Sequence, residues 1–111
     1  MFMNKTIFLP MFFYFLLSQS EFPTKNLEVG KTLFFSNCNV CHNGGNNIII
    51  PEKNLKKETL ARNGMNNLEA ITYQVTNGKN GMPAFGGRLK ESEIQEIGIY
   101  VLEESSKDFK N

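Results

Sequence analysis

The chain has 111 residues, with 12 Lys and Arg against 11 Asp and Glu and a formal net charge of +1. This length allows one domain at most, with a core small enough to benefit from an internal cofactor. The balanced charge and the lack of a basic run disfavour a nucleic-acid partner and stable association with an anionic membrane surface.

The first 20 residues differ in kind from the rest. Lys5 is their only charge, and an apolar run at residues 7–17 follows it, ahead of small and polar residues. This layout is typical of a secretory signal peptide. A retained membrane anchor is disfavoured because the run contains Pro10 and is shorter than the roughly twenty apolar residues of a spanning helix. We therefore expect residues 1–20 to be cleaved and residues 21–111 to form the mature domain.

A first helix is predicted to begin near Pro23. Gly30 and Phe34 fall on one face of it, and Cys38 follows Phe34 by one turn. Glycine inside a helix costs about 1 kcal/mol relative to alanine, so Gly30 indicates that another element approaches closely there. The helix leads directly into the motif that follows.

Cys38, Cys41 and His42 form the pattern Cys-x-x-Cys-His, which contains both cysteines and the only histidine of the chain. The pattern is the attachment signature of a c-type haem, and a shuffled chain of this composition would show it about once in six thousand cases. The alternatives are a zinc site, which needs four N or S ligands where the chain supplies three, a redox dithiol and a structural disulfide. We favour one covalent haem c, with Cys38 and Cys41 as thioether sites and His42 as an axial iron ligand.

The segment after the motif is rich in turn residues and then β-branched. Residues 48–50 are predicted to be an extended segment that lines an apolar crevice, because no second strand is available to pair with them. A backbone carbonyl near Pro51 is predicted to accept the Nδ1 proton of His42 and so to orient the ring. A short helix is predicted over residues 54–63, with a basic face that is either solvated or a docking patch.

Two amphipathic helices follow. The first is predicted to have Asn66 as its N-cap, and the second to span residues 90–104 with a capping box formed by Ser92 and Gln95. Gly98 on the second of these helices is expected to meet the first helix of the chain together with Tyr100. The chain is therefore predicted to be all-α, with about four short helices.

The loop between these two helices contains four glycines and carries Met82 between Gly81 and Pro83. A permissive residue before the methionine and a fixed φ after it suit a chain that brings one thioether to a defined point. We interpret Met82 as the second axial iron ligand. Met65 is the alternative and is more simply explained as core packing.

The chain resembles the cytochrome c6 family of class I cytochromes c over residues 27–109. The resemblance rests on the haem motif and on residues 46–53, 73–80 and 82–89. It implies the class I cytochrome c fold around one haem, in a monomeric, soluble electron carrier of the thylakoid lumen in an algal plastid or a cyanobacterium. Such a carrier takes an electron from cytochrome f of the cytochrome b6f complex and gives it to photosystem I.

The resemblance also assigns individual residues. It supports Cys38, Cys41, His42 and Met82 in the roles given above, and it implies that Gln74 tunes the haem potential and that Arg88 helps docking to photosystem I. The chain departs from the family pattern at Gly81, where alanine is usual, and at Phe109, where tryptophan is usual.

Two rival functions are considered, and the resemblance over residues 74–88 argues against the first. One is a bacterial carrier that feeds a terminal oxidase, and the other is a five-coordinate haem protein that binds a gas or peroxide. A His/Met pair would fill both axial positions, and no nucleophile and base pair is present, so we do not expect an enzyme.

Overall fold

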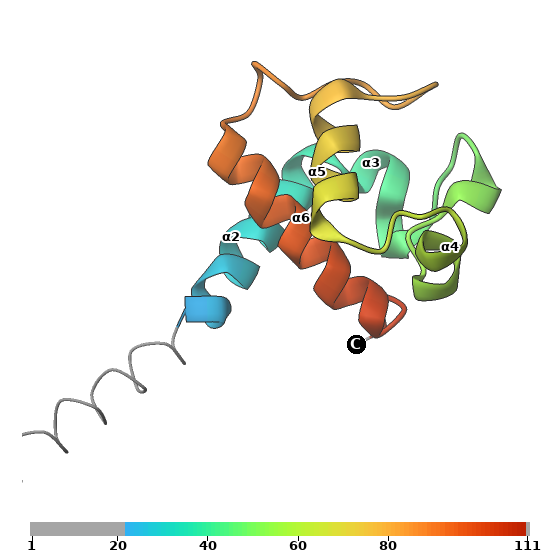
Figure 1. The fold of residues 1–111 in the computed structure, drawn as a ribbon, viewed down its shortest axis with the longest axis horizontal. Coiled ribbons are helices and arrows are strands. Elements are labelled where there is room, and N and C mark those ends of the chain that lie inside the picture. Colours follow the sequence, from blue (N-terminus) through green and yellow to red (C-terminus); the bar gives the residue numbers. More distant parts are fainter. Residues whose placement is uncertain (1–21, 111) are drawn as a thin grey trace, which may run out of the picture.

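The computed structural model describes residues 22–110, and the expected signal peptide lies outside them. The regular elements of this part of the chain are all helices, with isolated bridges but no strand, which confirms the all-α class (Figure 1). Its elements are α2 (Phe22–Asn37), α3 (Asn39–His42), the 3-10 turns η1 (Asn43–Gly45) and η2 (Pro51–Lys53), α4 (Lys57–Arg62), α5 (Leu68–Asn77) and α6 (Glu91–Ser106). None of the helices between residues 22 and 110 has the length and apolar character needed to span a bilayer.

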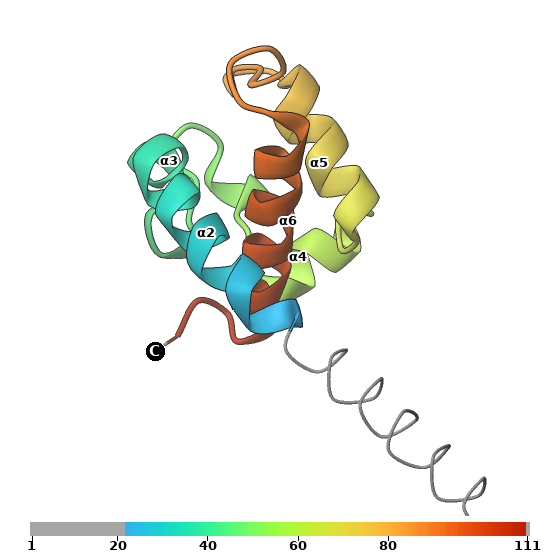
Figure 2. The same ribbon diagram turned by 90° about the vertical axis from the view of Figure 1, so that its left-hand side faces the viewer.

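Helix α6 lies between α2 and α5 and packs against both (Figures 1 and 2). At the crossing with α2, a methyl group on Gly30 would lie 2.9 Å from Cβ of Tyr100 and would overlap the carbonyl oxygen of Glu96. The ring of Phe34 stacks obliquely on Tyr100, with centroids 5.2 Å apart. The close approach that Gly30 indicates is thus confirmed.

Gly98 does not take part in that crossing, so its predicted contact with the first helix is wrong. A methyl group there would lie 2.7 Å from Cδ1 of Leu68 and 3.1 Å from Cγ2 of Thr72, both on α5. Two residues along a helix correspond to a rotation of about 200°, so Gly98 and Tyr100 must face different neighbours. Gly30 thus allows α2 to approach one side of α6, and Gly98 allows α5 to approach another side.

The core is formed where these three helices meet. Its buried apolar side chains come mainly from the inner faces of α2, α5 and α6. Cys38, Leu60 of α4 and Phe85 of the long loop between α5 and α6 (residues 78–90) complete it. The members on the three helices are Phe34, Ile71, Val75, Ile94, Ile97, Tyr100 and Val101.

The observed helix caps differ from the predicted ones by one or two residues. Asn67, not Asn66, caps α5: its backbone is extended and its Oδ1 accepts a hydrogen bond of 2.8 Å from the N–H of Ala70. At α6 the Glu93 carboxylate accepts from the N–H of Lys90 at 2.8 Å, so the Ser92/Gln95 box is also wrong. In each case the cap is the last residue with extended backbone angles.

The short basic helix is also shorter than predicted, because its first three residues do not join it. The side-chain oxygen of Asn54 accepts a hydrogen bond of 3.0 Å from the N–H of Lys56. The N–H of Leu55 donates to the carbonyl of Gly45 at 2.7 Å. The helix begins only at Lys57, whose N–H donates to the Asp108 carboxylate at 3.0 Å. Hydrogen bonds to Asn54, Gly45 and Asp108 thus take the place of the predicted first turn of this helix.

The two glycine contacts of α6 predict unequal costs for the same substitution. Gly30→Ala should lower the free energy of unfolding by about 3 kcal/mol, because the new methyl meets backbone at the α2–α6 crossing. Gly98→Ala should cost about 1 kcal/mol or less, because it meets the end of the Leu68 side chain, which can turn away. Both variants gain the same helix propensity, so urea unfolding of the two holoproteins compares the contacts alone. Equal costs would contradict this account.

Candidate haem-binding site

A largely apolar cavity lies between the Cys-x-x-Cys-His segment and the loop that carries Met82. Cys38, Cys41 and His42 line it, and so do Met82 and Gln74. The walls between them are apolar side chains, among them Phe34, Leu60, Ile71, Val75, Phe85, Ile97 and Val101. Apolar walls with sulfur and imidazole groups at the edges fit a flat, covalently held porphyrin.

The cysteine motif forms its own short helix at the end of α2. The N–H of Cys38 continues the hydrogen bonding of α2 by donating to Phe34 at 2.8 Å, and the carbonyl of Cys38 then accepts from Cys41 and His42 at 3.1 and 2.9 Å. Cys38 is only 8% exposed, and its burial, with the nearby Cys41, raises the pKa of its thiol to about 11. A neutral thioether suits this apolar position better than a thiolate would.

The His42 ring is oriented by a backbone carbonyl, as expected, but not by the one predicted. Its Nδ1 lies 2.8 Å from the carbonyl oxygen of Asn46, not from a carbonyl near Pro51. Positive φ angles at Gly44 and Gly45 reverse the chain and return the Asn46 carbonyl to the ring. A proton on Nδ1 leaves the other ring nitrogen free to bind a metal.

Asn47 holds the segment after this reversal, and the sequence reasoning missed it. Its Oδ1 accepts from the N–H groups of Ile49 and Ile50 at 3.0 and 2.9 Å, and its amide donates to the carbonyl of Lys53 at 3.0 Å. The signal was available, because an asparagine before a short apolar run is typical of such a side-chain turn. The prediction that this run lines an apolar crevice is confirmed for Ile49 and Ile50, whereas Ile48 does not line the cavity.

Met82, which lines the same cavity, is held by a tight turn. Lys79 and Met82 exchange two backbone hydrogen bonds of 3.1 and 2.9 Å, with Asn80 between them at φ 49°. The amide of Gln74 lies 3.6 Å from the Met82 sulfur, within the range for a hydrogen bond to sulfur. Met65 lines the cavity as well, so the cavity wall contains both candidate methionines.

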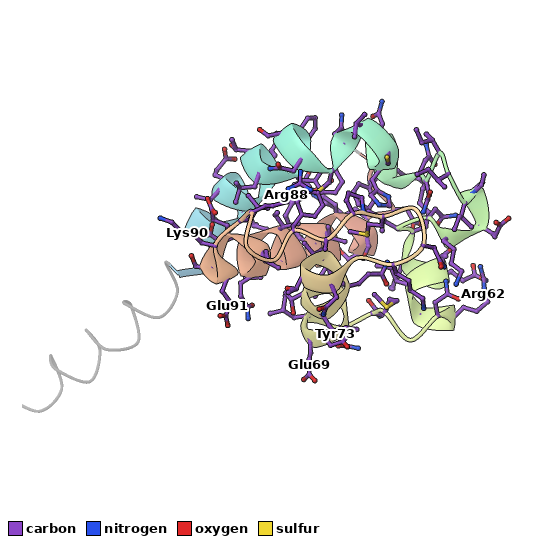
Figure 3. The ribbon with its side chains drawn as sticks, turned by 90° about the horizontal axis from the view of Figure 1, so that it is seen from above. Arg62, Glu69, Tyr73, Arg88, Lys90 and Glu91 are labelled. Carbon is purple, nitrogen blue, oxygen red and sulfur yellow. The ribbon has the colours of Figure 1, made fainter. Side chains whose placement is uncertain are left out.

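Arg88 is the one predicted site residue that does not line the cavity. Its guanidinium carbon lies 4.8 Å from the ring centroid of Phe85, which does line it. Figure 3 shows Arg88 on the long loop, on the same side of the molecule as Lys90. A positive charge is thus held next to the cavity wall.

The rival chemical interpretations of the motif gain no support from the geometry. Between residues 22 and 110 there is no group of three or more His, Cys, Asp and Glu side chains that could hold a metal ion. No disulfide joins Cys38 and Cys41. The zinc alternative therefore lacks a ligand set in the described part of the chain.

The chain is similar to a family model, to curated proteins and to solved structures. Residues 25–101 match the family model described as cytochrome c oxidase, cbb3-type, subunit III. Cytochrome c6 of Bumilleriopsis filiformis is 60% identical over 80 residues, which cover 72% of this chain and 93% of that protein. Cytochrome c6 of a Synechococcus strain is 54% identical over 80 residues, 72% of this chain and 71% of that protein. The solved cytochrome c6 of the diatom Phaeodactylum tricornutum is 45% identical, with a TM-score of 0.72 over 74% of this chain and 97% of that one.

The hydrogen bonds of Asn47 predict a clear difference between two adjacent asparagines. Asn47→Ala should lower the free energy of unfolding of the holoprotein by about 1 to 3 kcal/mol, because it leaves the N–H groups of Ile49 and Ile50 without their acceptor. Asn46→Ala is the matched control and should change it by no more than about 0.5 kcal/mol, since the exposed Asn46 orients His42 through its backbone. Urea unfolding measures both, and equal losses would contradict the role of Asn47.

Proposed function

Because the chain belongs to the cytochrome c6 family, within the wider cytochrome c family matched by residues 25–101, we propose that it carries single electrons from cytochrome f of the cytochrome b6f complex to photosystem I. Members of this family are electron carriers with one covalently attached haem c, and this chain is one of them. When bound, the haem iron supplies the one-electron redox chemistry.

The observation that supports this proposal is the meeting of two sets of residues at one apolar cavity. Cys38 and Cys41 would hold the haem through thioethers, while His42 and Met82 would take the two axial positions of the iron. With both positions filled by the protein, no site remains for oxygen or peroxide. A thioether ligand also favours the reduced state, which suits a carrier of high potential.

Gln74 and Arg88 would adjust this carrier. The Gln74 amide can donate to the Met82 sulfur at 3.6 Å, and such a bond draws electron density from the ligand and so tunes the potential. Arg88, held over Phe85 beside the cavity, would present a positive charge to a docking partner.

The site of action proposed for the carrier is the thylakoid lumen of an algal plastid or a cyanobacterium. The similar proteins of Bumilleriopsis and Synechococcus support such a source. Removal of residues 1–20 after export is part of the proposal, and the mature carrier is proposed to act as a monomer.

The two methionines of the cavity provide a direct test of the axial ligand. Met82→Ala should lower the midpoint potential by roughly 100 mV or more with the haem still attached, because axial ligands set haem potentials over about 0.8 V. Met65→Ala is the matched control and should shift the potential far less. Spectroelectrochemical titration of the two holoproteins decides between them. A large shift in Met65→Ala and none in Met82→Ala would assign the iron ligand to Met65.

The unaltered holoprotein also tests the alternative of a five-coordinate haem. Immediate, tight binding of cyanide or carbon monoxide to the unaltered holoprotein would show an exchangeable position and would contradict ligation by Met82.

The partner is tested by flash photo-oxidation with isolated photosystem I. The wild-type protein should donate electrons much faster than an unrelated cytochrome, and Arg88→Gln should lower the second-order rate constant roughly three- to tenfold at low salt, less at high salt. Arg62→Gln removes the same charge from α4, far from Arg88 and Lys90 in Figure 3, and should have little effect. Donation no faster than by the unrelated cytochrome would exclude photosystem I and favour a carrier that feeds an oxidase.

A further inference from the structure

The segment that follows His42 directly touches the loop that carries Met82. A methyl group on Gly81 would lie 3.0 Å from Cγ2 and 3.1 Å from Cδ1 of Ile49, so the Ile49 side chain already fills the space beside this glycine. Both residues line the cavity, and Ile49 is 53% exposed, which places their contact at its mouth. Ile49 follows His42 by seven residues, and Gly81 directly precedes Met82.

Ile49 is fixed relative to the haem-attachment motif. Its N–H is held by the Asn47 side chain at 3.0 Å, and the N–H of the preceding residue, Ile48, donates to the carbonyl of Cys41 at 3.1 Å. The carbonyl of Asn46 in the same segment orients His42. The position of the Ile49 side chain is thus tied to the side of the cavity that carries His42.

Gly81 is fixed relative to Met82 in the same way. The paired hydrogen bonds between Lys79 and Met82 close the turn that contains Gly81, so its backbone cannot move far without moving Met82. Because Gly81 has no side chain, the Ile49 methyl groups pack against the turn itself. A change of volume at this contact is therefore passed to Met82.

We propose that Ile49 and Gly81 are positioning residues that hold Met82 on the iron by joining the segment after His42 to the loop that carries Met82, at the mouth of the cavity. This inference rests on the proposed role of Met82 as axial ligand. The contact limits outward movement of the Met82 turn and keeps water from the thioether. It makes glycine, not alanine, the residue that fits before the ligand in this chain, because Ile49 occupies the place of the methyl group.

The test is the rate at which cyanide displaces Met82 in the oxidised holoprotein, followed with the weak near-infrared band of the thioether–iron(III) bond. Gly81→Ala should speed displacement about five- to tenfold, because the added methyl overpacks the contact. Ile49→Ala should also speed displacement, because it removes the side chain that packs against the Met82 turn. The double variant restores a methyl–methyl contact in the vacated space and should be slower than either single variant, a coupling that independent sites do not show.

Ile48→Ala is the matched control. Ile48 is the neighbour of Ile49, is 67% exposed and does not line the cavity, so its rate should equal that of the wild type. If Gly81→Ala does not assemble with haem, Ile49→Val, which removes only Cδ1, should still give a measurable increase.

Three outcomes would overturn the proposal. These are an unchanged rate in both Gly81→Ala and Ile49→Ala, strictly additive effects in the double variant, and an equal effect of Ile48→Ala. Met82→Ala separates a failure of the premise from a failure of the contact. If the wild type binds cyanide as fast as Met82→Ala does, Met82 is not the ligand. If Met82→Ala alone is fast, only the Ile49–Gly81 contact is refuted.

Discussion

The close crossing of α2 and α6 at Gly30 is the contact on which the site depends. With no side chain at that position, the α6 backbone at Glu96 can approach α2 and bring Tyr100 against Phe34. Phe34 lines the haem cavity and lies one turn before Cys38, so the same crossing fixes the start of the attachment motif. A wider separation of the two helices would move the motif away from the wall formed by Ile97 and Val101. The cavity is therefore a consequence of how closely two helices meet.

Of the two proposed ligands, His42 ends α3 and Met82 lies in the loop between α5 and α6, and hydrogen bonds of the adjoining turns hold both positions. The turn after His42 is held through Asn46 and Asn47, and the turn before Met82 is closed by its own backbone. In the proposed carrier, turns held in this way would keep both proposed ligands in place in either oxidation state, which would lower the reorganisation that accompanies electron transfer. The helices α2, α5 and α6 contribute to the apolar wall, while α3 and the loop after α5 supply the proposed ligands.

Sequence reasoning succeeded where a pattern is local. The pattern of Cys38, Cys41 and His42 indicated the cofactor, and the helical spacing of apolar residues indicated the core faces of α5 and α6. It failed where the outcome depends on backbone angles or on a helix rotation that only packing sets. The carbonyl that orients His42 follows from positive φ at two glycines, and the partner of Gly98 follows from which side of α6 faces α5. The cap of α5 was misplaced between Asn66 and Asn67 because both residues are chemically suitable.

The C-terminal segment shows how a second departure from the family pattern fits the same site. Phe109, where tryptophan is usual, has a positive φ of 59° and packs on the backbone of Gly45, whose added methyl would lie 2.7 Å from Cγ of the ring. Its centroid is 6.2 Å from that of Phe34. Phe109, three residues beyond the end of α6, therefore packs against both the helix that precedes the cysteine motif and the turn that follows it. Asp108 also accepts a hydrogen bond from the first N–H of α4. One short segment after α6 therefore contacts three parts of the fold that lie 51 or more residues earlier in the chain. The glycine at position 45 is thus required twice, by its φ of 80° and by the ring that covers it.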